Sequence, residues 1–330
     1  MATNELLVPL HVSYIQKLGQ NKDDLTYHLT SHLRLNAVYW GLTALAVMGH
    51  QDALNREEMI DFVMSCWDEE QGAFGAHPDH DAHLLSTLSA IQILIMQDAL
   101  DRVDVDRVVK YILSLQQPSG VFAGDNFGEI DTRFLYCAVS ALSLLGRLDE
   151  LDKEKTVGYL KRCKNYDGGF GSVVGAESHA AQVFVCTAAL AILDKLDEVV
   201  DTDTLGWWLA ERQLPNGGLN GRPEKLEDVS NPLSIKPLSD YAGVIRFATV
   251  SGSSRHSLSS RKSRGLTLRS WKLSSSVHRM RKEEASQIDQ GIWSMYSIPC
   301  SELPGFRYWA ILAWSTWTRY IVCLRRSSRN

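Results

Sequence analysis

QGAFGAHP, at residues 71–78, is the first of four glycine-rich turns that recur along the chain. The other three are SGVFAGDN at 119–126, DGGFGSVV at 167–174 and NGGLNGRP at 216–223. Their aligned large residues, spaced 48, 48 and 49 positions apart, are Phe74, Phe122, Phe170 and Leu219. A fixed period of this length is typical of a protein built from stacked copies of one supersecondary unit.

Helical patterns flank each of these turns. Segments such as 108–117 and 204–213 precede a turn and are apolar at roughly helical spacing. The first three turns are followed by apolar runs rich in Ala and Leu: HLLSTLSAIQIL, RFLYCAVSALSLLG and HAAQVFVCTAALAIL. Each repeat is therefore predicted to pair an amphipathic helix with a mostly buried one, and such pairs must stack to bury their apolar faces.

Two stackings are open to such helix pairs, an open solenoid and a closed ring. A glycine-rich turn before every apolar helix favours the ring, with the apolar helices lining a central cavity. We predict an all-α fold, an α/α barrel of helix-pair repeats of about 48 residues. No fifth turn stands near residue 267, so the barrel is expected to be incomplete towards the C-terminus.

The ninth residue after each aligned position is polar and begins the inner helix. These residues are His83, Asp131, His179 and Asp228. In a ring of inner helices they would lie around one rim of the cavity. Capping of the helix N-termini is the alternative explanation, and Asp131 and Asp228 are well suited to it.

Charged neighbours favour an anion-binding role for part of this rim. Arg133 stands two residues beyond the second rim position, and Glu177 stands two residues before His179. The segment NGRPEKLEDV, residues 220–229, brings Arg222 and Lys225 together three positions apart. Arg supplies a planar fork and Lys a point charge, which suits a diphosphate near a helix N-terminus. A solvated charged loop is the alternative for this segment.

Residues 14–229, about two-thirds of the chain, resemble the β subunits of the protein prenyltransferases. The resemblance is carried by AVYWGLTAL (37–45), FAGDNFGEIDTRF (122–134), NYDGGFGSVVGAESHAAQ (165–182) and LGWWLAERQLPNGGLNGRPEKLEDV (205–229). At residues 211–223 the sequence is more similar to the type II, or Rab geranylgeranyltransferase, branch than to the farnesyl or type I branches.

The resemblance implies an isoprenoid in the barrel and a zinc ion at its mouth. The positions implied to bind geranylgeranyl diphosphate are His179, Ala180, Ala181, Arg222, Lys225 and Arg133. Asp228 is implied to be a zinc ligand, and with Lys225 it forms the implied catalytic pair. The chain departs from the family pattern at Ala181, where Gly is usual, and at Asn36, where the type II branch has Ser.

The implied reaction moves a geranylgeranyl group onto C-terminal cysteine thiols of Rab GTPases. Zinc would hold the acceptor thiol, whose ordinary pKa is about 8.5, as the thiolate, while cations stabilise the departing diphosphate. The implied partners are a prenyltransferase α subunit, as a heterodimer, and Rab GTPases with their Rab escort protein. The implied location is the cytoplasm.

The zinc site departs from the family pattern. The family uses Asp, Cys and His ligands, and its Cys should stand two residues after Asp228, where this chain has Ser230. The later zinc His, in a motif like RPGDMVDxFHT, is also missing. A non-catalytic remnant that keeps the lipid cavity is therefore the alternative function. A terpene-cyclase-like enzyme would need an acidic DxDD or DDxxD motif, which the sequence lacks.

The chain divides in composition at Val229. Residues 1–229 carry a formal charge of −16, and residues 230–330 carry +11 and 21 of the serines. Read one nucleotide out of frame, codons for residues 287–330 permit DRPGDMVDVFHT and the rest of the family's C-terminus. We therefore interpret 1–229 as the prenyltransferase repeats, and 230–330 as a retained intron followed by a frameshifted C-terminus.

Composition excludes several other classes of protein. A chain that is 45% hydrophobic and 22% charged is typical of a soluble globular protein. Its six Cys, scattered without a CxxC pair, predict buried reduced thiols. No basic segment precedes the first apolar residues, and the apolar stretch 308–318 is too short to span a bilayer. The Arg- and Ser-rich stretch 253–269 suggests nucleic-acid binding, but a shifted frame accounts for that composition, so no nucleic-acid partner is expected.

Overall fold

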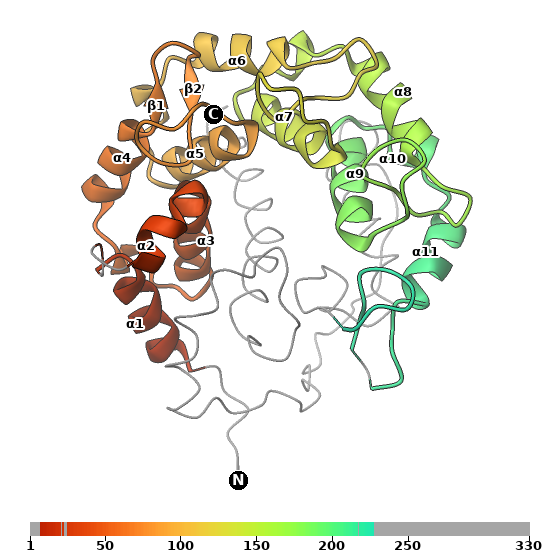
Figure 1. Ribbon diagram of the computed structural model, residues 1–330, viewed down its shortest axis with the longest axis horizontal. Coiled ribbons are helices and arrows are strands. Elements are labelled where there is room, and N and C mark those ends of the chain that lie inside the picture. The colour runs from red at the N-terminus through yellow and green to blue at the C-terminus, as the bar shows by residue number, and fades with distance from the viewer. Residues whose placement is uncertain (1–6, 21, 23–24, 217, 228–330) are drawn as a thin grey trace, which may run out of the picture.

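The structure, a computed structural model, describes residues 7–20, 22, 25–216 and 218–227. Within them, helices alternate between an inner and an outer layer along an arc (Figure 1). The inner helices are α3 (Arg34–Val47), α5 (Leu84–Met96), α7 (Thr132–Leu144) and α9 (Ala180–Ile192). The outer helices are α1 (Val8–Leu18), α4 (Arg56–Ser65), α6 (Val105–Ser114), α8 (Lys153–Cys163) and α11 (Thr202–Ala210).

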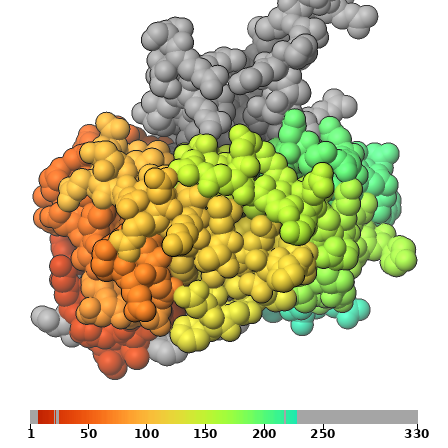
Figure 2. Space-filling view, turned by 90° about the horizontal axis from the view of Figure 1, so that it is seen from above, coloured from red at the N-terminus to blue at the C-terminus, as the bar shows by residue number. Residues whose placement is uncertain are grey.

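Short elements join these helices. They are α2 (Leu25–Leu29), α10 (Leu196–Val199), β1 (Trp67–Asp68), β2 (Ala73–Phe74) and 3-10 turns at Ser31–Leu33, Gln51–Ala53, Leu100–Arg102 and Leu148–Glu150. Each inner helix packs against the next one along the chain. Figure 2 shows the repeats side by side in sequence order, from orange through yellow to green. The predicted helix pairs and their two layers are confirmed.

Asp or Asn side chains cap the N-termini of the outer helices that follow α1. The capping residues are Asn55, Asp104, Asp152 and Asp201, and each accepts a hydrogen bond from a backbone N–H of the first turn. Such a cap contributes about 1 kcal/mol because it satisfies a donor that the helix itself leaves unpaired. The four caps share one position in the repeat, so they give a common origin for comparing the outer helices.

The aligned residue of each turn joins the end of an outer helix to the core. Phe74 pairs with Trp67 in the antiparallel β1–β2 ladder. In the three later turns the aligned residue forms an isolated antiparallel bridge instead: Gln116 with Phe122, Lys164 with Phe170, and Gln213 with Leu219. The three Phe side chains are fully buried. The turns predicted as loops therefore contain a minimal β pairing that fixes where the large side chain enters the core.

Glycine in these turns is required by a close approach between repeats. Gly120 has φ +93°, and a Cβ there would lie 2.1 Å from the carbonyl oxygen of Lys155. Gly168 has φ +85°, and its Cβ would lie 2.8 Å from the backbone nitrogen of Leu205. Each turn thus touches the start of the next outer helix, and only glycine combines this backbone with that contact.

Hydrogen bonds between inner helices and turns connect the repeats in series. The backbone N–H at the start of each inner helix donates to a carbonyl in the following glycine-rich turn. The pairs are Leu35 to Ala76, Leu84 to Gly124, Thr132 to Ser172 and Ala180 to Gly221, at 2.8–3.0 Å. These donors have no partner within their own helix, so each repeat completes the hydrogen bonding of the one before it.

Four cysteines lie in the described part of the chain, Cys66, Cys137, Cys163 and Cys186, all buried free thiols. Burial raises the pKa of Cys66 and Cys137 to about 12, so both are protonated and unreactive near neutral pH. The expectation of buried reduced thiols is confirmed for these four, and the other two lie outside the described residues. None of the helices described is both long and apolar enough to cross a bilayer.

Candidate functional site

The predicted rim residues cap the inner helices. The Nδ1 atoms of His83 and His179 accept from backbone N–H groups two residues on, at 3.1 and 3.0 Å. Asp131 accepts from the backbone N–H of Arg133 at 2.7 Å. The capping explanation therefore holds for these three positions, and the fourth, Asp228, lies outside the described residues. In a neutral His whose Nδ1 accepts, the proton is on Nε2, which is a suitable donor to a phosphate oxygen.

The fourth glycine-rich turn reaches the start of α9, where His179 stands. Gly221 accepts from the Ala180 N–H at 2.9 Å. A Cβ at Gly221 would lie 3.1 Å from both Cε1 and Nε2 of His179, so the turn packs directly against the imidazole. The next residue, Arg222, donates from Nη1 to Oε2 of Glu177 at 2.9 Å. A donor His, a guanidinium and an orienting carboxylate are thus brought together from two segments.

Lys225 lies on the same turn and is exposed. Its backbone N–H donates to the Arg222 carbonyl at 3.4 Å, and its own carbonyl accepts from the Asn220 side chain at 3.1 Å. Within the described residues its ammonium group forms no ion pair, whereas Arg222 is paired. The turn therefore holds the Lys225 backbone in place and leaves its charge to solvent.

The backbone N–H groups of the two alanines beside His179 form hydrogen bonds that stabilise the fold. The Ala180 N–H donates to the Gly221 carbonyl, and the Ala181 N–H donates to the His179 ring. Ala180 is also buried and Ala181 half-buried. Their part at this site is to join the turn to the helix and to fix the His179 tautomer.

Arg133 lies at the neighbouring rim position. Its Nη2 is 3.0 Å from Oδ2 of Asp131, and its guanidinium carbon is 5.6 Å from the centre of the Phe134 ring. The His83 ring stands edge-on to Phe134, with 5.3 Å between ring centres. Burial lowers the pKa of His83, and Arg133 lowers it further, against the opposing effect of Asp125 and Glu129. Arg133 is therefore tied to its own helix cap.

Sequence spacing missed one rim residue, Arg34. It stands where His83, Asp131 and His179 stand in the later repeats, because the following Leu35 N–H donates to the Ala76 carbonyl in the same way. Its guanidinium carbon lies 3.5 Å from the Tyr27 ring centre, and burial lowers its pKa. The other rim residues are found by counting nine positions from the aligned residue of a glycine-rich turn. No such turn precedes α3, so this count cannot locate Arg34.

The described residues do not make up a zinc site. Among them, no three His, Cys, Asp or Glu side chains are grouped closely enough to hold a metal ion. Asp228, the implied first ligand, and Ser230, at the implied Cys position, both lie outside the described residues. The part of the rim that is described provides cations and hydrogen-bond donors, the groups that an anion requires.

Comparison with known proteins covers most of the chain. Residues 6–230 match the family described as the prenyltransferase alpha-alpha toroid domain. The geranylgeranyl transferase type-2 subunit beta of Saccharomyces cerevisiae is 54% identical over 229 residues, 68% of this chain and 70% of that protein. Its counterpart from Candida albicans is 48% identical over 234 residues, 66% of this chain and 68% of that protein.

Solved structures share the fold. The Candida albicans protein geranylgeranyltransferase-I complexed with GGPP aligns with a TM-score of 0.67 and 17% identity, covering 96% of this chain and 92% of that one. A type II terpene cyclase from Scytonema aligns with a TM-score of 0.52 and 11% identity, covering 74% and 77%. The predicted α/α barrel fold is thereby confirmed over the open solenoid. The chain belongs to the prenyltransferase α/α-toroid family, is by family a prenyltransferase, and is similar to geranylgeranyl transferase type-2 β subunits.

Proposed function

We propose that this chain acts as the catalytic β subunit of a Rab geranylgeranyltransferase. It would transfer the geranylgeranyl group of geranylgeranyl diphosphate to C-terminal cysteine thiols of Rab GTPases, in the cytoplasm. An α subunit would complete a heterodimer, and a Rab escort protein would present the substrate. The observation that carries the proposal is the position of Arg222, held by Glu177 at 2.9 Å on the turn that packs against His179.

The proposed chemistry depends on a leaving group that gains negative charge. As the bond between the isoprenoid and the diphosphate breaks, that charge is stabilised by the Arg222 fork, the Lys225 ammonium and the Nε2–H of His179. Glu177 orients the guanidinium, and the cap to Ala181 orients the imidazole. Arg133, already paired with Asp131, would contribute from the neighbouring repeat.

Zinc has a limited place in this proposal. The family's metal would hold the acceptor thiol as the thiolate, and Asp228 is the residue proposed to bind it. Ser230 cannot replace the thiolate ligand expected at its position. The support for the proposed transfer therefore comes from the diphosphate site. The acceptor side requires zinc ligands that the sequence lacks at the family positions.

Binding of geranylgeranyl diphosphate to the purified full chain tests the diphosphate site. Arg222→Ala and Lys225→Ala are each expected to weaken binding by about tenfold or more, since each removes a charge-assisted contact. Lys110→Ala removes an exposed lysine from outer helix α6 and is the matched control. Equal affinities for all three variants and the parent chain would contradict the proposal.

A second candidate function is a non-catalytic lipid-diphosphate-binding remnant, and Ser230 is the residue that favours it. Prenyl transfer to a Rab GTPase, measured with an α subunit, escort protein and zinc present, separates the two candidates. Transfer with stoichiometric, Asp228-dependent zinc supports the enzyme. Tight binding of the isoprenoid diphosphate without transfer supports the remnant.

We also propose that the prenyltransferase repeats end at Val229, and that residues 230–330 arise from a retained intron and a frameshift. The change in charge from −16 to +11 at this boundary supports the proposal. Sequencing the cDNA across codons 225–260 tests it. An uninterrupted reading frame that encodes the tail, with no spliced form, would refute it.

A further inference from the structure

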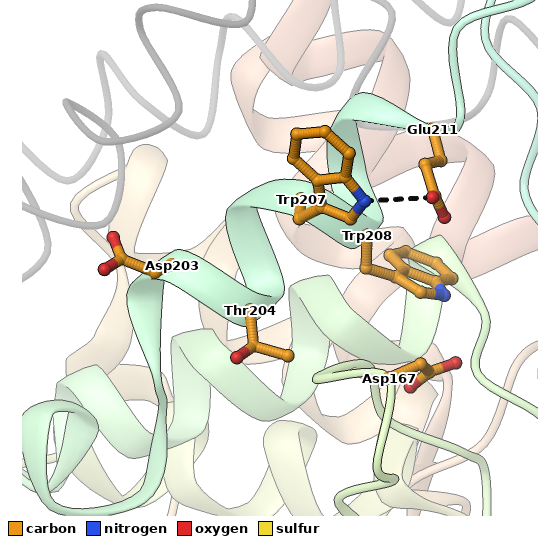
Figure 3. A pocket seen from close by; sticks show the side chains of 6 residues that line it. All are labelled: Asp167, Asp203, Thr204, Trp207, Trp208 and Glu211. Atoms are coloured by element: carbon orange, nitrogen blue, oxygen red, sulfur yellow. Dashed lines mark hydrogen bonds between the residues drawn. The ribbon is translucent and has the colours of Figure 1, made fainter.

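A groove on the outer side of the fourth repeat lies between helix α11 and the third glycine-rich turn (Figure 3). Its volume is about 440 Å³, and it is lined by Asp167, Asp203, Thr204, Trp207, Trp208 and Glu211. Asp167 comes from the turn and the others from α11 and the residue that follows it. The proposed diphosphate residues do not line this groove, so it is a separate feature.

Trp207 is 71% exposed although its indole is held in place. Its Nε1 donates to Oε1 of Glu211 at 3.0 Å, as the dashed line in Figure 3 shows. Counted from the helix caps, the same position holds Asp61, Lys110 and Gly158 in the earlier outer helices, none of them buried. Further repeats follow those helices and still leave the position uncovered. The position therefore faces outward in each of these repeats, and Trp207 is not buried between the repeats that the structure describes.

The floor of the groove is formed by buried side chains in contact with one another. Trp208 is buried, and the Arg212 guanidinium carbon lies 4.7 Å from its ring centre. Arg212 also donates from Nε to the Trp208 carbonyl at 3.2 Å, and its side chain is 5% exposed. The residues at the position of Arg212 in the earlier repeats are Cys66, Leu115 and Cys163, all buried. Only in the fourth of these repeats does a buried cation hold the aromatic ring beneath the groove.

The accessible charges of the groove are negative. Asp203 and Glu211 are exposed on α11 and just after it. Asp167 is fixed by the Gly169 N–H at 2.9 Å and the Ser178 hydroxyl at 2.8 Å. The Nη2 atom of Arg212 lies 3.9 Å from Oε2 of Glu211, but this cation is buried below the surface. A ligand entering the groove would meet an indole face between carboxylates, which is the chemistry that recognises Lys or Arg side chains.

We propose that this groove docks a Lys- or Arg-bearing segment of a partner protein, with a cationic side chain over Trp207. Exposed tryptophans in pockets are common anchors of protein interfaces. The turn that supplies Asp167 continues through Glu177 to His179, so a segment docked here lies on the outer side of the loop that carries part of the proposed diphosphate site. The inference goes beyond the proposed function and does not depend on it.

Fluorescence anisotropy with the full chain tests the docking site. The probe is a short fluorescein-labelled peptide of alternating Arg and Ser residues, with a Glu and Ser peptide for comparison. Trp207→Ala is expected to weaken binding of the Arg peptide about tenfold. Asp203→Asn and Glu211→Gln are expected to weaken it about threefold each, and the amide that Glu211→Gln introduces still offers the indole an acceptor. The Glu peptide should not bind.

Asp61→Asn is the matched control, because it removes an acidic group from the equivalent outward position of α4. If it weakens binding as much as Asp203→Asn does, the general acidity of residues 1–229 explains the binding and the proposal is overturned. Unchanged binding in Trp207→Ala, or equally tight binding of free arginine amide, would also overturn it. Geranylgeranyl diphosphate binding by the same variants should be unchanged, which separates failure of this site from failure of the proposed function.

Discussion

The fourth glycine-rich turn and its outer helix share a backbone plan with the first three but not their side chains. The antiparallel bridge, the helix cap and the hydrogen bond to the preceding inner helix all recur in the fourth repeat. Where the earlier repeats bury Phe at the aligned position, the fourth has Leu219, which is 9% exposed. It also carries Arg212 where the others have Cys or Leu, and Trp207 where they have Asp, Lys or Gly.

This difference separates the residues that build the ring from those proposed to bind a diphosphate or a partner. The first three turns are occupied by residues that pack, and their exchange is expected to cost stability. The fourth turn carries Arg222 and Lys225, and its helix carries the groove. Substitution of the aligned Phe residues and of the contacting glycines in the first three turns is therefore expected to act through folding, and substitution of Arg222, Lys225 or Trp207 through binding.

The largest expected loss of stability comes from replacing a glycine that lies at the contact between the second and third repeats. Gly120→Ala places a Cβ 2.1 Å from the Lys155 carbonyl oxygen at φ +93°. Because the obstacle is backbone, we expect a loss of about 4 kcal/mol or more in the free energy of unfolding. Urea unfolding followed by circular dichroism measures it.

Gly146→Ala is the control for Gly120→Ala. Gly146 has φ +73°, and a Cβ there meets nothing within 4 Å, so only the backbone cost of about 1–2 kcal/mol applies. Equal losses in the two variants would mean that contact between the repeats does not require the glycine.

The next effect concerns the aligned large residue. Phe170→Ala should cost about 3–5 kcal/mol, because the side chain is fully buried and leaves a large cavity. Leu219→Ala should cost about 2 kcal/mol, at the low end for buried leucine, since the site is partly open. Thermal and urea unfolding of both variants gives the comparison. A larger loss for Leu219→Ala would contradict the view that the earlier repeats carry the packing.

The sequence was sufficient for the helix pairs and, with the family resemblance, for placing His179 and Arg222 at one site. Each turn repeats a large residue, because that residue enters the core, and a glycine, because the turn touches the next outer helix. These two requirements produce the period seen in the sequence. His179 and Arg222 fall at the same rim because the Gly221 carbonyl bonds to the start of α9. Periodicity placed His179 on the rim, and the family resemblance grouped Arg222 with it.

Other features could not be read from the sequence. Arg34 has no glycine-rich turn before it, and a backbone hydrogen bond reveals its place on the rim. The pairing of Glu177 with Arg222 joins residues 45 positions apart. In LGWWLAERQ, either tryptophan could face the core, because that depends on how the helix is rotated against the neighbouring turn. Contacts between repeats decide these features, and they leave no local pattern.

A smaller effect is expected at Arg212, the buried cation of the fourth repeat. Its Nη1 is buried and has no hydrogen-bond partner in the described part of the chain. Arg212→Met keeps an unbranched chain beneath Trp208 and removes the cost of burying that donor. We expect the free energy of unfolding, measured by urea unfolding, to stay unchanged or to rise by up to about 1 kcal/mol.

Arg212→Ala provides the contrast, because it removes the packing as well as the charge. It should destabilise the chain by about 2 kcal/mol or more. If Arg212→Met destabilises as strongly as Arg212→Ala does, the charge itself stabilises the fourth repeat. The fourth repeat would then differ from the earlier ones, which bury Cys or Leu at this position, in being stabilised by a buried charge.

The smallest effect concerns pH and His83, at the rim of the second repeat. Burial holds the pKa of His83 below its ordinary value of 6.5. Below that pH the unfolded chain therefore binds a proton that the folded chain resists, and stability falls with falling pH until the folded pKa is passed. Protonation at Nδ1 also removes the acceptor for the Leu85 N–H.

His83→Asn tests this pH dependence, because Asn keeps a good helix cap and does not titrate. The variant should lose less stability than the parent chain between neutral pH and a pH below the folded pKa, in urea titrations at matched ionic strength. If the variant and the parent chain lose stability alike, the cap of the second repeat does not sense protonation, and its His serves packing alone, as the Phe residues of the first three turns do.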